Sequence, residues 1–144
     1  MKESESFHIL FIKLFSTLIK FFCDKFYIIG ENTSIWNSVK GFDSTQFPYP
    51  QAMALSDSIK KIDELNQYDV CKFANLILEG LKQKMVDYWI LLLSKYSKLQ
   101  NIHREDAPIY HRSQLTTICF ELRRLYDFTE EIDNSFISQY SYLF

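Results

Sequence analysis

Glycine and proline are scarce in this chain of 144 residues, which has three of each. β-Sheet proteins need many tight turns, and tight turns use both residue types. A few long helices joined by few loops need far fewer. Gly30, Gly41 and Gly80 also lie too far apart to form a glycine-rich phosphate-binding loop. We therefore expect an all-α protein without a nucleotide-binding motif.

Cysteine is equally sparse. Cys23, Cys71 and Cys119 are odd in number, and no two are close in the sequence. A disulfide framework or a zinc site of the Cys-x-x-Cys type needs cysteines in pairs. All three positions fall within apolar helical patterns, which is typical of buried thiols. We therefore expect free cysteines, a reducing compartment and a cytoplasmic location.

Histidine, the commonest metal ligand, occurs three times. His103 and His111 enclose Glu105 and Asp106. This segment has the pattern of a polar loop, without a helical register that would gather ligands on one face. We expect no metal site and no cofactor.

No charge of one sign dominates, since 16 basic residues face 18 acidic ones and the net charge is −2. This balance gives no overall attraction to nucleic acid or to an anionic membrane. Apolar residues make up 47% of the chain and charged residues 24%, which suits an ordered chain with one hydrophobic core. We expect a single domain over residues 1–144, no nucleic-acid partner and no small-molecule ligand.

The first apolar segment predicts a helix over residues 5–29 that is nearly engulfed by the core. Lys13 and Thr17 lie on one narrow polar stripe, and apolar residues cover most of the remaining surface. The lysines interrupt the run too often for a membrane span. As alternatives to a core role, the helix could lie on a membrane surface or bind a partner through Phe7, Phe11 and Phe15.

An irregular stretch follows over residues 31–50. It should contain a short helix that is capped by Thr33 or Ser34, runs through Val39 and is stopped by Gly41. The FPYP sequence at 47–50 is expected to be extended, because a residue before proline avoids the helical region. Long loops are often functional, so its aromatic residues either pack onto the bundle or bind a partner. The binding candidates are Trp36, Phe47 and Tyr49.

Three further helices are expected. One spans about 50–65, with Pro50 at its first position and an apolar edge of Ala52, Met53, Leu55, Ile59 and Ile62. The longest spans about 70–102, is capped by Asp69, and is apolar nearly all round at 86–93, which should be its most buried part. Gly80 within it marks a kink or the close approach of another helix.

The third covers about 107–128, with a core face of Leu115, Ile118, Cys119, Leu122, Leu125 and Tyr126. A last helix over 130–140 is either separate or continuous with it. The fold class is thus all-α: an irregular bundle of four to five helices with a long central helix at about 70–102.

One spacing resembles a family motif. Arg104, six intervening residues and His111 match the Arg-x(4–6)-His signature of HEPN-type ribonucleases, which are small helical bundles. The resemblance implies that Arg104 stabilises phosphate charge and His111 transfers protons at a phosphodiester. It covers only these eight residues, and the Asp106-Ala107-Pro108 filling departs from the family pattern.

All four arginines lie between 104 and 124, and Arg112 and Arg123 share one flank of the expected 107–128 helix. They could bind an anion or an acidic partner. Alternatively they form ordinary surface ion pairs, Arg123 with Asp127 and Arg124 with Glu121.

Aromatic residues make up 17% of the chain, an unusual surplus. Apolar and aromatic surface on a small helical domain is typical of proteins that bind another chain. We therefore expect a non-catalytic interaction module (an adaptor, a regulator or a subunit of an oligomer or complex) whose partner is another protein chain, self or hetero, and we do not expect an enzyme. The alternatives are a HEPN-like ribonuclease and a peripheral membrane protein that uses the 5–29 helix.

Overall fold

The computed structural model describes residues 9–18, 35–96, 112–124 and 126, and every regular element in these ranges is helical. A helical segment at 9–18 comes first. It is followed by α2 (Ile35–Val39), the 3₁₀ turn η1 (Ser44–Gln46), α3 (Pro50–Asp63), α4 (Asp69–Lys82), α5 (Val86–Lys95) and α7 (Arg112–Arg123). The all-α prediction is therefore confirmed for the described residues. The rest of the expected 5–29 helix, Gly30 and the expected 130–140 helix lie outside them.

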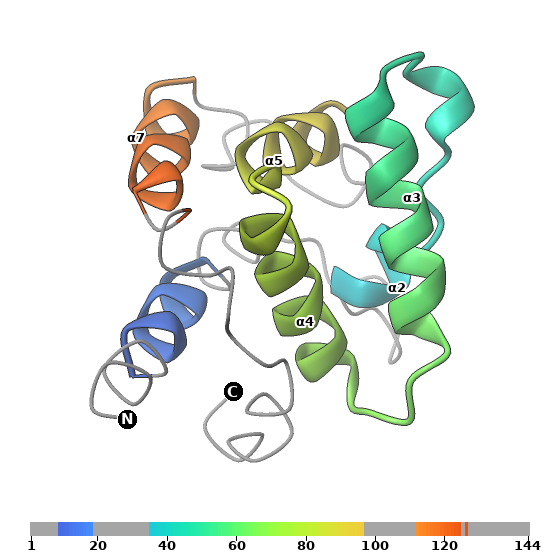
Figure 1. Cartoon of the computed structure of the whole chain (residues 1–144), viewed down its shortest axis with the longest axis horizontal. Coiled ribbons are helices and arrows are strands. Elements are labelled where there is room, and N and C mark those ends of the chain that lie inside the picture. The colour runs from blue at the N-terminus through green and yellow to red at the C-terminus, as the bar shows by residue number, and fades with distance from the viewer. Residues whose placement is uncertain (1–8, 19–34, 97–111, 125, 127–144) are drawn as a thin grey trace.

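Helix α4 occupies the middle of the arrangement (Figure 1). It packs against α2, α3 and α5, while α5 also packs against α3 and, most extensively, α7. The described part of the chain has no helix long and apolar enough to cross a membrane.

The irregular stretch before α3 follows its local residue signals. Helix α2 ends at Val39, just before the turn at Gly41, and the Asp43 side chain caps η1 by accepting from the Thr45 backbone N–H at 2.9 Å. Tyr49 is extended, and Pro50 is the first residue of α3, where its missing N–H costs nothing. The predictions for the end of α2, the extended residue before Pro50 and the start of α3 are confirmed, whereas η1 was not predicted.

The predicted continuous helix over 70–102 is wrong, because the chain turns at residues 83–85. The Lys84 N–H donates to the Leu81 carbonyl at 3.1 Å and the Met85 N–H to the Gly80 carbonyl at 2.8 Å, the two bonds of a Schellman helix end. Lys84 takes the left-handed backbone conformation that this motif requires, with φ of 58°. Helix α5 then ends at Lys95, before an extended Tyr96.

Gly80 explains how tightly the two helices meet at this turn. A Cβ atom at position 80 would lie 2.8 Å from the Val86 Cβ and 2.9 Å from the Trp89 Cε3. Real Cβ atoms do not approach neighbours so closely, so α5 can fold back onto α4 only because residue 80 lacks a side chain. The predicted close approach of another helix at Gly80 is confirmed.

A second correction concerns the start of α4. Tyr68 is the N-cap residue, and Asp69 is the first helical residue rather than the cap. Its carboxylate still lies in the first turn, where the helix dipole favours a negative charge.

The core is formed by one face of each helix. Trp89 is 2% exposed, which confirms its expected burial. Aromatic rings connect distant segments: Phe15 packs on Phe73 with ring centroids 5.8 Å apart, and Phe42 packs on Tyr96 at 5.4 Å. Further buried residues are Phe11, Leu18, Trp36, Val39, Ala52, Leu55, Ile59, Ile62, Leu76, Ile77, Leu81, Val86, Ile90, Leu93, Leu115, Cys119 and Leu122.

Several apolar residues face solvent where the patterns predict burial. Met53 is exposed on α3, and Leu10 is exposed on the 9–18 helix, which is therefore not engulfed there. Within 86–93, Tyr88 and Leu91 are exposed although their neighbours are buried. Helical periodicity marks apolar positions, but it does not show how much of a helix circumference other elements cover.

Candidate functional site

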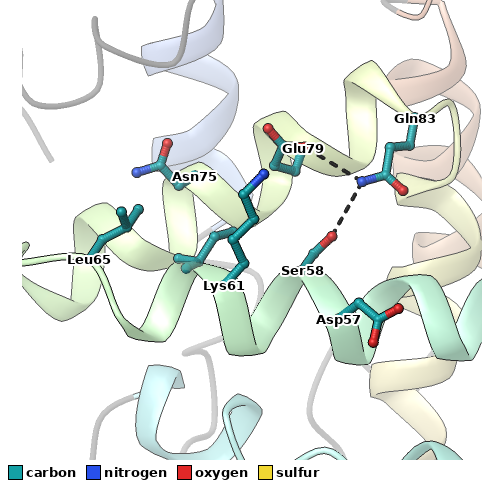
Figure 2. Close-up of a pocket in the computed structure, with 8 residues that line it drawn as sticks. Asp57, Ser58, Lys61, Leu65, Asn75, Glu79 and Gln83 are labelled. Carbon is teal, nitrogen blue, oxygen red and sulfur yellow. Dashed lines mark hydrogen bonds between the residues drawn. The ribbon is translucent and has the colours of Figure 1, made fainter.

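A pocket of about 350 Å³ lies between α3 and α4 (Figure 2). We call it the α3–α4 groove. Its volume is within the range of about 300–1,000 Å³ that is usual for small-molecule sites. The lining residues are Asp57, Ser58, Lys61 and Ile62 of α3, Leu65 after α3, Asn75 and Glu79 of α4, and Gln83 at the end of α4.

Helical spacing brings the lining side chains of α4 into one row. Asn75, Glu79 and Gln83 are separated by steps of four, so they lie above one another on one face of α4. Ser58 and Ile62 are likewise four residues apart on α3. Because α3 packs against α4 and both rows line the pocket, the two rows lie on the two sides of the groove.

Hydrogen bonds fix the polar side chains of the groove at both ends. The Gln83 Nε2 atom donates to the Ser58 Oγ at 3.3 Å and to the Glu79 Oε2 at 3.5 Å, which links the two helices. At the other end the buried Asn75 donates through Nδ2 to the Gln67 Oε1 at 2.6 Å. These hydrogen bonds therefore fix the orientation of Gln83 and Asn75 at the two ends of the groove.

The groove combines an apolar surface with charges of both signs. Ile62 is buried and Leu65 is half exposed. Asp57 and Glu79 supply carboxylates, and the Lys61 side chain extends from α3 toward α4. The sequence patterns do not single out Asp57, Lys61 or Glu79, because charged residues on helices resemble ordinary surface residues until the partner helix is placed.

A second polar cluster joins α5 to α7. Asp87 is buried, and its Oδ2 atom accepts from the Arg123 Nε at 2.8 Å. Its Oδ1 atom accepts from the Tyr126 hydroxyl, and the Asp87 backbone N–H donates to the same Tyr126 oxygen at 3.1 Å. Burial and the hydrogen bond to Asp87 raise the pKa of Tyr126 well above its ordinary value, so the phenol stays protonated. These hydrogen bonds link α5 to α7 and to Tyr126, which follows α7.

The two described cysteines, Cys71 and Cys119, are free and buried, which confirms the prediction for them. Burial, and secondarily the nearby Asp87 carboxylate, raises the pKa of Cys119 to about 11. Burial also raises the pKa of Cys71. Because the thiolate is the reactive form, both thiols are poor nucleophiles at neutral pH. Cys23 lies outside the described residues.

The aromatic binding candidates fall into two groups. Phe11, Phe15 and Trp36 are buried in the core, and the Trp36 indole N–H donates to the Asp63 Oδ1 at 2.9 Å. Their side chains therefore face other parts of the chain rather than solvent. Phe47 is partly buried and stacks on Phe42 with centroids 5.6 Å apart, whereas Tyr49 is exposed.

The two arginine candidates also differ in their surroundings. Arg112 is exposed at the first position of α7, while Arg123 is bound to Asp87. The predicted pair of Arg124 with Glu121 is confirmed at 3.4 Å. Phe7, Arg104, His111 and Asp127 lie outside the described residues, so the HEPN-like site stays a prediction. Among the described residues, no group of three His, Cys, Asp or Glu side chains could hold a metal ion.

Exposed apolar residues lie on the outer sides of three packed helices. Tyr88 is 52% and Leu91 37% exposed on α5, and Phe120 is 58% exposed on α7. Tyr49 and Met53 are exposed at the start of α3, one helical turn apart. A partner could contact these exposed side chains, whereas Phe11 and Phe15 are buried and inaccessible.

The chain matches no protein-family model, no curated protein and no solved structure at a significant level. Its function is therefore inferred from its own residues.

Proposed function

We propose that the chain is a non-catalytic interaction module that binds a different protein through the outer face of α5. The carrying observation is the exposure of Tyr88 and Leu91 on a helix whose opposite face, with Trp89 and Ile90, lies in the core. A surface helix ordinarily carries polar residues on its solvent side. Helix α5 instead presents large apolar side chains on both sides.

The charge of this face indicates the chemistry of the partner. Tyr88, Leu91 and Lys95 follow steps of three and four, so they form one exposed row along α5. The one acidic residue of α5, Asp87, is buried and bound by Arg123. An amphipathic helix whose apolar stripe is flanked by carboxylates would cover Tyr88 and Leu91 and pair with Lys95.

The scaffold supports this role because α5 is held from several sides. It packs against α3, α4 and α7, and the Asp87 cluster links it to α7. A face that is fixed before binding loses little conformational entropy on association. The outer face of α5 is therefore suited to recognition without rearrangement.

Site-specific photo-crosslinking tests the proposal. A benzophenone amino acid replaces Tyr88 in the protein expressed in its native cells, and the matched control replaces Tyr68, which is 79% exposed between α3 and α4. We expect a discrete adduct from position 88 only, with the crosslinked peptide rich in apolar and acidic residues. Leu91→Glu and Lys95→Glu should each reduce the adduct without loss of helicity by circular dichroism.

Three outcomes would contradict the proposal. The first is an equal yield of adducts from positions 88 and 68, and the second is the absence of any adduct from position 88. The third is an adduct that joins two copies of this chain, which would overturn the choice of a different protein as the partner.

A further inference from the structure

We propose that the α3–α4 groove binds a small zwitterion with an apolar side chain, the chemistry of a free apolar α-amino acid. This site is separate from the outer face of α5, so a negative result for one proposal leaves the other unaffected. The case rests on three kinds of surface that the groove brings together: an apolar wall, carboxylates and an ammonium group.

The apolar wall of the groove favours a ligand with an aliphatic side chain. Ile62 is buried at the side of the groove, and Leu65 follows at the end of α3. An aliphatic side chain that leaves water to lie against them gains favourable free energy in proportion to its buried area. A pocket of about 350 Å³ has room for a molecule of amino-acid size and little more.

The carboxylates select a cationic group. Glu79 reaches the groove from α4 and Asp57 from α3. Gln83 donates to the Glu79 Oε2 at 3.5 Å and so orients this carboxylate. An ionised carboxylate has about four acceptor sites, so Glu79 can accept further hydrogen bonds from a ligand ammonium group.

An ammonium group selects an anionic group of the ligand. It belongs to Lys61 of α3, whose side chain extends toward α4. The Ser58 Oγ accepts from Gln83 at 3.3 Å and keeps its own hydroxyl proton to donate. A ligand with only a positive group would meet the like charge of Lys61, and one with only a negative group would meet the like charges of Asp57 and Glu79. A zwitterion can place an opposite charge against each of these side chains.

A nuclear magnetic resonance titration with L-leucine tests this site. The side-chain NH₂ groups of Gln83 and Asn75 line the groove and give distinct ¹H–¹⁵N signals. We expect saturable shifts of both signals. Leucinamide lacks the carboxylate and N-acetylleucine lacks the amine, so each should bind about tenfold more weakly, the loss of about one charge-assisted hydrogen bond.

Matched variants locate the binding. Lys61→Met and Glu79→Gln should each weaken leucine binding about tenfold. Lys60→Met and Glu64→Gln alter exposed neighbours that do not line the groove, so they should leave it unchanged. The proposal is overturned if no saturable shift occurs up to about 10 mM leucine, if the three ligands bind equally, or if the control variants weaken binding as much. Unchanged crosslinking from position 88 in Glu79→Gln would show that the two sites are distinct.

Discussion

Replacing Gly80 with alanine tests how the α4–α5 turn is built. In an ordinary helix interior this change stabilises the protein by about 1 kcal/mol, because alanine loses less backbone entropy. Here the new Cβ would lie 2.8 Å from the Val86 Cβ and 3.0 Å from the Val86 Cα. The second contact is with the backbone, so no side-chain rotation can relieve it, and α5 must move away from α4.

The expected magnitude follows from these opposing terms. Overpacking of a core costs about 1–3 kcal/mol, and contact with backbone favours the upper end of that range. After the helix-propensity gain is subtracted, the free energy of unfolding should fall by about 2 kcal/mol. Separation of the helices would also loosen the packing of Trp89, whose Cε3 atom would lie 2.9 Å from the same Cβ.

Urea denaturation followed by circular dichroism measures the effect. With a slope of about 2 kcal/mol/M, the midpoint of Gly80→Ala should fall by about 1 M, and the larger Gly80→Val should fall further. Lys82→Ala, two residues along α4, is the matched control and should shift the midpoint little. The reasoning is refuted if Gly80→Ala raises the midpoint, as it would in a helix with open space beside residue 80.

Three further predictions concern the helix end at Lys84, the contacts between α5 and α7, and the buried thiol of Cys119. Lys84→Gly should stabilise the protein by about 1 kcal/mol, because glycine adopts a φ of 58° without cost, whereas Lys82→Gly inside α4 should destabilise it by about 1 kcal/mol in the same urea assay. Asp87→Asn should lower the thermal midpoint through a loss of about 2 kcal/mol, because it weakens two buried hydrogen bonds; Arg123→Met should cost less, since the arginine is half exposed. The free energy of unfolding should decline between pH 9 and 11, because the Cys119 pKa is about 9 in the unfolded chain and about 11 in the folded one, so the unfolded state loses its proton first; Cys119→Ala should flatten this decline.

Each of these expectations has a contrary result. Equal losses for the two glycine variants would deny the Schellman geometry at Lys84. A larger effect of Arg123→Met than of Asp87→Asn would show that the arginine, not the buried carboxylate, holds α7 in place. An identical pH dependence with and without Cys119 would place the titration elsewhere.

Local residue signals sufficed to predict much of the fold. Pro50 sets the start of α3, the turn at Gly41 follows α2, and the spacing of Leu115, Cys119 and Leu122 gives the buried face of α7. These features depend on neighbours within a few residues. Backbone sterics and helical periodicity are then enough to place them.

The break between α4 and α5 could not be located in the same way. The apolar pattern runs from residue 70 through 93 without a gap, and Lys84 is an unusual residue for a left-handed helix end. Only the contact of Gly80 with Val86 shows why the chain turns there. That contact depends on how the two helices pack, which periodicity does not encode.

The candidate sites were still less visible in the sequence. Asp87 looks like an isolated charge in an apolar run, and its partners Arg123 and Tyr126 come 36 and 39 residues later. Lys61 and Glu79 become a facing pair of charged walls only when α3 lies against α4. Such sites arise from tertiary juxtaposition of residues that are individually ordinary.

The two tryptophans provide built-in optical reporters on two different helices, α2 and α5. Trp36 on α2 donates its indole N–H to the Asp63 carboxylate, whereas the indole N–H of Trp89 on α5 has no hydrogen-bond partner among the described residues. Their emission spectra should therefore differ, with Trp89 the bluer of the two. Single-tryptophan variants would then show by fluorescence whether the region around α2 and the α4–α5 turn lose their native packing together or in succession.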